Sequence, residues 1–116
     1  MPHLIIEISQ GVQVDGDELL LAANHALFAT GQFKHAKDIK SRIHRTDHSL
    51  IGFGDDGELF VSVRLLIMAG RDDKTKHDLV ETVLTAVQNV IGQVHANVQY
   101  AVDLQELSPY YQKTIV

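Results

Sequence analysis

The stretch LFVSVRLLIMAGRDDKTKHDLVETVLTAVQNVI, residues 59–91, decides the fold, because a strand pattern leads directly into a helix pattern. Residues 59–67 are typical of a strand. Asp72 and Asp73 follow, and carboxylates are favoured at a helix N-terminus. One apolar stripe then predicts a helix over about 73–92; it comprises Leu79, Val80, Val83, Leu84, Val87, Val90 and Ile91. Strict alternation predicts the last strand at 98–104, with Val98, Tyr100, Val102 and Leu104 on one side.

The preceding half of the chain repeats this arrangement. Residues 4–8 indicate a buried strand, and Asp15 with Glu18 resembles a capping box. Apolar residues at three- and four-residue steps predict a helix over about 16–30, which Gly31 is expected to end because glycine readily adopts the left-handed conformation. A second strand is predicted directly afterwards.

That second strand, at about 39–47, carries basic side chains at alternate positions. Because successive side chains of a strand point to opposite faces, Lys40, Arg42 and His44 are expected to share one face. The sequence therefore predicts a strand with a basic face.

The order strand, helix, strand, then strand, helix, strand predicts an α+β fold with a pseudo-repeat of two βαβ units, at 1–52 and 57–108. Asp56 and Gly57 form a turn signal, and we expect them to help join the units through a hairpin. Right-handed crossovers would place both helices on one face of a four-stranded sheet. The other face would be bare, so we expect an oligomer that covers it.

Composition limits the class of protein. A length of 116 residues indicates a single domain, 1–116. The chain has no cysteine, which excludes disulfides, thiolate metal sites and a cysteine nucleophile. We expect a cytoplasmic protein, because no secretion signal and no membrane-spanning apolar run are recognisable. The net charge of −5 opposes nucleic-acid binding.

Pro2 is a candidate base if Met1 is removed, because the chain would then begin with a secondary amine. Burial and nearby cations would lower the pKa of that amine and keep it neutral near pH 7. Lys40 or Arg71 could supply such a cation. The alternative is that Pro2 merely begins an edge strand, where the missing N–H is harmless.

Arg71 and the basic strand are candidates for binding a carboxylate. Arg71 stands between a strand and a helix N-terminus, where its planar guanidinium could grip an acid; alternatively it pairs with Asp72 or Asp73. Lys40 and Arg42 could face an anion or form structural pairs.

The seven histidines give little support for a metal site. His44 and His48 have the spacing that converges on one ion from a helix, whereas on an extended chain they would lie about 13 Å apart. We therefore expect no metal.

Several motifs together resemble 5-carboxymethyl-2-hydroxymuconate isomerase, a family of the tautomerase superfamily. They are MPH at the start, ATGQF at 29–33, IKSRIH at 39–44, Asp47, and FVSVRLLIMAGR at 60–71. The resemblance extends over nearly the whole chain. It implies a homotrimer of tautomerase-like subunits, each with two βαβ units.

The resemblance also implies an activity, keto–enol isomerisation of a carboxylic acid in the catabolism of aromatic compounds, without a metal or organic cofactor. Pro2 would be the catalytic base, with Arg71 and Lys40 as catalytic and substrate-binding cations. Lys40 stands where the family has an arginine, so it lacks the fork that grips a carboxylate by two bonds. Arg42 could compensate as a further substrate-binding residue. The alternative function is a non-catalytic trimer that binds a small acid or a protein.

Overall fold

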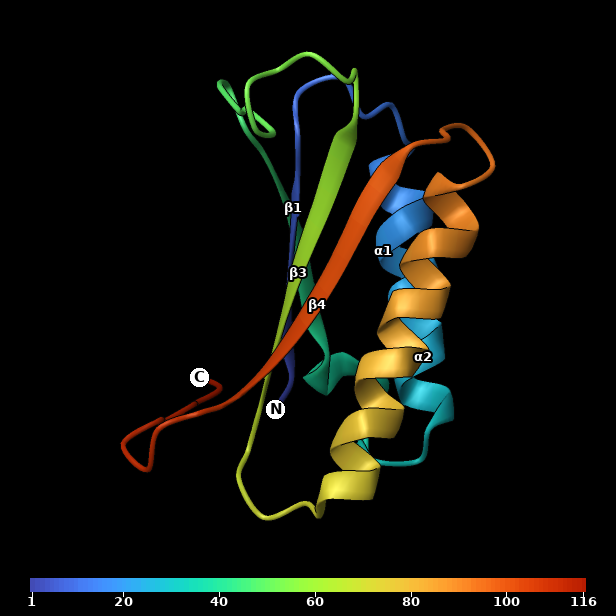
Figure 1. Ribbon diagram of the computed structural model, residues 1–116. Helices are drawn as coiled ribbons and strands as arrows, with labels where there is room; N and C mark the ends of the chain where they lie inside the picture. The colour runs from blue at the N-terminus through green and yellow to red at the C-terminus, as the bar shows by residue number, and fades with distance from the viewer.

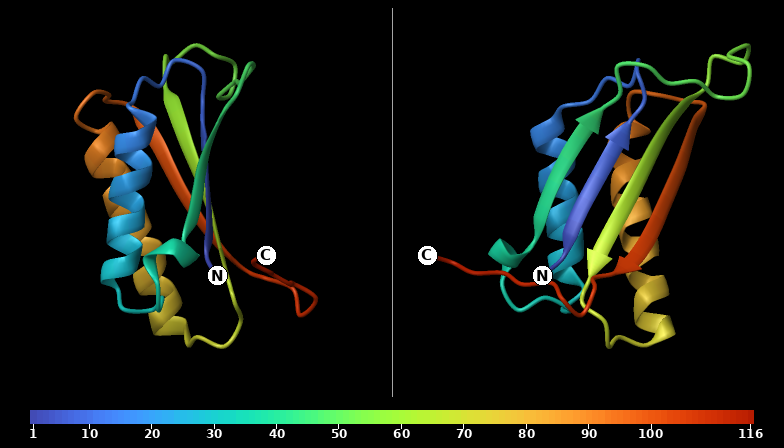
Figure 2. Two further views of the ribbon diagram at one scale, coloured as in Figure 1. Left: turned by 180° about the vertical axis from the view of Figure 1, so that it is seen from behind. Right: turned by 90° about the vertical axis from the view of Figure 1, so that its left-hand side faces the viewer.

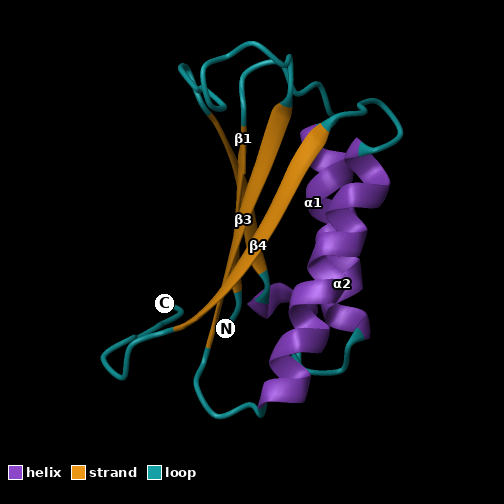
Figure 3. Ribbon diagram, in the orientation of Figure 1, coloured by secondary structure: helices purple, strands orange, loops and turns teal.

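A four-stranded sheet covered on one face by two helices forms the molecule (Figures 1 and 3). The computed structural model describes residues 1–116. Its elements are β1 (His3–Ile8), α1 (Gly16–Ala29), the short 3₁₀ helix η1 (Ala36–Asp38), β2 (Lys40–Arg45), β3 (Leu59–Ile67), α2 (Asp73–Ile91) and β4 (Val98–Glu106). These elements confirm the predicted order and both predicted helices. No helix is long and apolar enough to cross a membrane.

The sheet has the strand order β2-β1-β3-β4. β1 runs parallel to β2, β3 runs parallel to β4, and the central pair, β1 and β3, is antiparallel. The predicted hairpin between the two βαβ units is therefore wrong, because β1 lies between β2 and β3 and separates them. The segment 46–58 instead crosses the end of β1 as a long connection (Figure 2).

The helix ends follow the sequence signals. The Asp15 side chain accepts a hydrogen bond from the Glu18 amide at 3.2 Å, and Asp72 accepts one from the Thr75 amide at 2.9 Å. Each bond satisfies an amide that has no partner within its helix. Gly31 has a φ of 76° just beyond α1, as its predicted role requires.

Alternation along the strands separates a buried face from an open one. The core contains Leu4, Ile6 and Ile8 of β1 and Val61, Val63, Leu65 and Ile67 of β3, packed under α1 and α2. The intervening side chains occupy the open face, where both helices are absent (Figure 2). In agreement with the prediction, register places Lys40, Arg42 and His44 on this face, opposite His3, Ile5 and Glu7.

The strand directions bring four chain segments to one end of the sheet. β1 and β2 begin at this end, whereas β3 and β4 finish there. The N-terminus, the start of β2, the connection into α2 and the C-terminal segment therefore meet at the end drawn lowest in Figure 1.

Candidate active site

Pro2 is buried at the start of the central strand β1. Its carbonyl accepts a hydrogen bond of 3.1 Å from the amide of Lys40, which fixes the start of β2 beside it. Arg71 follows β3 at the same end of the sheet. The fold thus brings together three of the predicted site residues, which are far apart in the sequence.

Lys40 is only partly exposed. Its ammonium group donates a hydrogen bond of 3.0 Å to the carbonyl of Asp38. Burial lowers the pKa of Lys40, and the neighbouring Lys113 lowers it further, whereas Asp38 raises it. Lys40 forms no ion pair within the chain, so the alternative in which it pairs across neighbouring strands is wrong.

Arg71 is held by the loop that follows α1. Its Nε donates to the side chain of Gln32 at 3.1 Å, and its Nη2 donates to the Gln32 carbonyl at 2.9 Å. Its Nη1 donates to the Met68 carbonyl at 3.3 Å. Three of the five guanidinium N–H groups are thus used, and the remainder can bind a ligand.

The predicted alternative pairing of Arg71 with Asp72 or Asp73 is wrong, because neither carboxylate forms an ion pair with it. The reason is local. The Asp72 side chain turns to the Thr75 amide to cap α2, and the hydrogen bonds that Thr75 donates lower the pKa of Asp72.

The N-terminal amine lies among positive charges. Burial lowers the pKa of the Met1 amine, and the charges of Arg71, Lys40 and Lys113 lower it further. Asp38 acts in the opposite direction. Both burial and nearby cations disfavour the ammonium form. An amine at this end of the sheet is therefore biased toward its neutral, proton-accepting form.

Arg42 lies by His3 rather than by the N-terminal amine. Arg42 Nη1 is 3.5 Å from His3 Nδ1 on the open face, and Arg42 is exposed to solvent. Burial lowers the pKa of His3, and Arg42 is the second cause. Arg42 is therefore displaced along the strand from Pro2, Lys40 and Arg71.

Sequence reasoning missed two charged residues of this cluster, Asp38 and Lys113. Asp38 belongs to η1, directly before β2, and Lys113 belongs to the segment after β4. Lys113 Nζ lies 3.3 Å from Asp38 Oδ1. The only available signal was the proximity of Asp38 to Lys40 in sequence, because the C-terminal segment has no periodic pattern.

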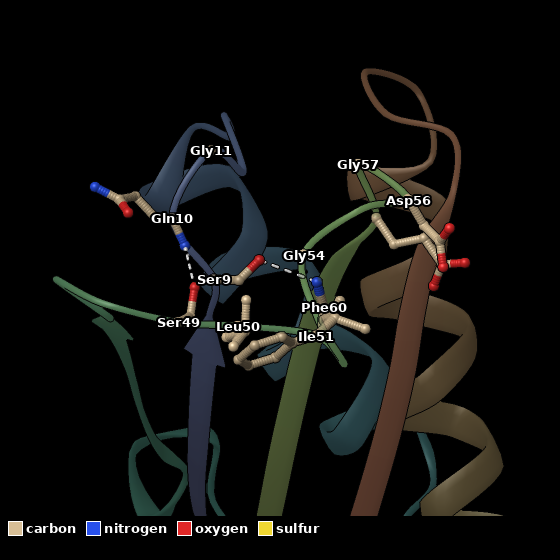
Figure 4. Close-up of a pocket in the computed structure, with 11 residues that line it drawn as sticks. Ser9, Gln10, Gly11, Ser49, Leu50, Ile51, Gly54, Asp56, Gly57 and Phe60 are labelled. Atoms are coloured by element: carbon tan, nitrogen blue, oxygen red, sulfur yellow. Dashed lines mark hydrogen bonds between the residues drawn. The ribbon is translucent and has the colours of Figure 1, made fainter.

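Three hollows lie elsewhere on the chain. One of about 330 Å³ lies between the 9–11 turn and the 46–58 connection, at the end of the sheet opposite Pro2. Figure 4 shows two hydrogen bonds there: the hydroxyl of Ser9 accepts from the Phe60 amide, and the hydroxyl of Ser49 accepts from the Gln10 amide. Asp56 and Glu58 line it without any Lys, Arg or His, so it is unsuited to an acid.

The second hollow, of about 720 Å³, lies between the outer sides of α1 and α2, and the third, of about 290 Å³, lies on the open face. None of the three is lined by Pro2, Lys40 or Arg71. No group of three or more His, Asp or Glu side chains is arranged to hold a metal ion.

The chain matches the sequence model of 5-carboxymethyl-2-hydroxymuconate isomerase over residues 2–114. No curated protein sequence matches it significantly.

Solved structures share the fold. A 5-carboxymethyl-2-hydroxymuconate isomerase from Deinococcus radiodurans R1 aligns with a TM-score of 0.82 at 20% identity, over 98% of this chain and 90% of that one. A 5-carboxymethyl-2-hydroxymuconate delta-isomerase aligns with a TM-score of 0.87 at 16% identity, over 100% and 89%. A fused 4-OT wild type symmetric trimer aligns with a TM-score of 0.67 at 14% identity, over 97% and 93%.

Proposed function

Because the chain belongs to the 5-carboxymethyl-2-hydroxymuconate isomerase family, we propose that it converts an enol or dienol carboxylic acid to its keto tautomer, with Pro2 as general base once Met1 has been removed. The observation that carries this proposal is the position of Pro2. It is buried, its carbonyl is bonded to the amide of Lys40, and the adjacent amine has its pKa lowered by burial and by three cations.

The proposed reaction moves one proton. The lone pair of the Pro2 amine takes the proton of the enol hydroxyl, and the resulting ammonium returns a proton to a carbon further along the conjugated system. The hydroxyl oxygen becomes the carbonyl oxygen and the double bonds shift, so that no atom is gained or lost. The proline ring restricts the direction of the lone pair, which favours productive geometry.

Arg71 and Lys40 are proposed to bind the acid and to stabilise the negative charge that develops on the dienolate. Arg71 keeps free N–H groups while Gln32 and Met68 hold its position. Lys40 supplies charge without a planar fork, so it would hold an acid group less directionally. Arg42, beside His3, is proposed to attract the acid toward the open face rather than to contact the reacting atoms.

We further propose that the protein is a homotrimer that buries the open face of its sheet. This face carries the partly exposed apolar side chains Ile5 and Leu66, and neither helix covers it; only the C-terminal segment crosses its end near His3. A structure with the same fold is a symmetric trimer. Subunits packed through these faces would also exclude water from the adjacent Pro2.

Ultraviolet absorbance of 2-hydroxymuconate tests the activity. The chain with Met1 removed, verified by intact mass, should accelerate ketonisation, and Pro2→Ala should reduce kcat at least about 100-fold. Ser49→Ala, at the opposite end of the sheet, is the matched control and should retain the rate. Equal rates for wild type and Pro2→Ala would exclude Pro2 as the base. Binding of the acid without any turnover would instead identify a non-catalytic acid-binding protein.

A further inference from the structure

The segment after β4, residues 107–116, folds back across the end of the sheet where the chain begins (Figure 2). The amide of Leu107 donates to the Ile67 carbonyl at 2.7 Å. Further along, the Tyr111 hydroxyl lies 2.9 Å from His3 Nε2, and the two rings meet edge to face. The segment is thus attached to β3 and β1 before it reaches Lys113.

The side chain of Lys113 reaches the N-terminal residue, Met1. Its ammonium nitrogen is 3.3 Å from Asp38 Oδ1 and also 3.3 Å from the sulfur of Met1. The Lys113 side chain is 25% exposed and that of Asp38 21%, so the pair is partly shielded from water. Shielding makes a charge at this place more effective than on an open surface.

Met1 marks the space that a substrate would enter. Its side chain contacts Lys113, and its amine is close enough to Arg71 and Lys40 for their charges to lower its pKa. If Met1 is removed, the group in front of the Pro2 nitrogen would be the substrate, with Lys113 at its side.

The three cations at this end, Lys40, Arg71 and Lys113, differ in their hydrogen-bond partners. Lys40 donates to a backbone carbonyl, and Arg71 is bonded to Gln32 and Met68. Lys113 is the one whose partner is a carboxylate, and a substrate carboxylate can replace Asp38 with the same chemistry. Around the Met1 amine, the charge of one acid group, Asp38, acts against the charges of three cations, Arg71, Lys40 and Lys113.

We propose that Lys113 is a further substrate-binding residue, which binds a second carboxylate and thereby contributes to the preference for a dicarboxylic over a monocarboxylic acid. The inference rests on the proposed function in that it concerns the same site, but binding alone can test it. In the competing interpretation, Lys113 only fastens the C-terminal segment to Asp38.

The probes are trans,trans-muconate and sorbate, two six-carbon dienoic acids in which a carboxylate of the first is a methyl group in the second. Titration calorimetry of the full chain with Met1 removed gives the ratio of the two affinities. Wild type should bind muconate more tightly than sorbate. Lys113→Gln should weaken muconate binding about tenfold, the range expected for a charge-assisted hydrogen bond, and leave sorbate binding within about twofold. Lys113→Arg should restore the preference.

Asp38→Asn separates the two interpretations. If Lys113 binds substrate, loss of the competing carboxylate should raise the muconate preference, opposite in sign to Lys113→Gln. If Lys113 only fastens the segment, both substitutions should have the same effect. Tyr111→Phe removes a different attachment of the segment, keeps the charge of Lys113, and should leave the muconate-to-sorbate ratio unchanged.

Three results would overturn the proposal: no preference for muconate in wild type, a preference that survives Lys113→Gln, or equal effects of Lys113→Gln and Asp38→Asn. None of them depends on turnover. Loss of the isomerase activity proposed above would be seen separately, in the absorbance assay with Pro2→Ala.

Discussion

The guanidinium carbon of Arg71 lies 5.0 Å from the centre of the Phe33 ring. Phe33 belongs to the ATGQF motif and Arg71 to the AGR motif, so two motifs separated in the sequence by β2 and β3 form one contact. Together with the bonds to Gln32, this contact fixes the guanidinium at the end of the sheet where Pro2 begins β1. The Arg71 guanidinium is therefore held in one position by these contacts.

Arg71→Ala should lower kcat/KM for 2-hydroxymuconate about 100-fold or more, because a positioned cation would be lost from the acid site. The free energy of unfolding should fall by about 1–2 kcal/mol through the lost hydrogen bonds, measured in urea. Gln32→Ala removes only the partner of Nε and should keep activity within about threefold. An equal loss in both variants would mean that Arg71 acts by ordering the loop.

The pH dependence of kcat/KM should show a base whose pKa is lower than that of an ordinary N-terminal proline. Burial lowers the pKa of the Met1 amine most; Asp38 opposes this, and Arg71, Lys40 and Lys113 add to it. The same surroundings should act on the Pro2 amine once Met1 is removed, so the rate should rise with pH and level off early. Lys40→Gln removes a cation, which favours the ammonium form and should move the midpoint to higher pH. Asp38→Asn removes an anion and should move it to lower pH. Unchanged midpoints in both would contradict the assignment.

Gly70→Ala should disturb the site through the backbone alone. Gly70 has a φ of 121°, directly before Arg71, and nothing lies within 4 Å of the position of an added Cβ. Such a backbone costs about 1–3 kcal/mol for a residue with a side chain, and relaxation of the strain would move Arg71. We expect lower thermal stability and a higher KM. Gly52→Ala, with a φ of 56° and equally open surroundings far from the site, should reduce stability but keep KM.

His3 should make the fold sensitive to mild acid. Burial lowers its pKa, and Arg42, Lys40, the N-terminal amine and Lys113 add to this effect. The unfolded chain, with a His pKa of about 6.5, then binds more protons than the folded chain, so stability falls as pH drops below that value toward the folded pKa. Tm measured between pH 5 and 8 should show this slope, which His3→Gln should flatten. Arg42→Gln should reduce the slope of Tm against pH, because Arg42 contributes to the lowered pKa of His3. A steeper slope in Arg42→Gln would contradict the prediction.

Ile5→Glu should dissociate the proposed trimer. Ile5 lies on the open face between Arg42 and Arg64, which can pair with the new carboxylate within one chain, so the subunit should remain folded. Burying that carboxylate between subunits would be costly. Sedimentation velocity should therefore detect monomers, while circular dichroism remains native-like. Thr85→Glu, on the outer side of α2, should leave the assembly unchanged, and a trimeric Ile5→Glu would place the interface elsewhere.

Local chemistry made most of the fold predictable. Asp15 and Asp72 marked the helix starts, and alternation in 98–104 identified β4 together with its buried side. The Asp56-Gly57 signal led to a wrong prediction, a hairpin between β2 and β3. The signal expresses only a local turn preference, whereas pairing between distant segments decides which strands are neighbours. β1 gains partners on both sides by lying between β2 and β3, and a sequence window around residue 56 holds no information about this.

The residues of the candidate site were predictable where they belong to a sequence motif. Pro2, Lys40 and Arg71 stood in recognisable stretches, although their convergence depends on strand direction and register. Lys113 contacts residues at the other end of the chain and lies in a segment without regular structure, so no spacing rule indicates it. The bonds of Arg71 to Gln32 are equally non-local.

The 46–58 connection is a suitable place to attach a fluorescent label. Phe53, within this connection, is 97% exposed, and the connection lies at the opposite end of the sheet from Pro2. Because the chain has no cysteine, Phe53→Cys would provide a single thiol for a maleimide dye. Fluorescence from that dye could then report subunit exchange in real time, with the chemistry at the remote end left undisturbed.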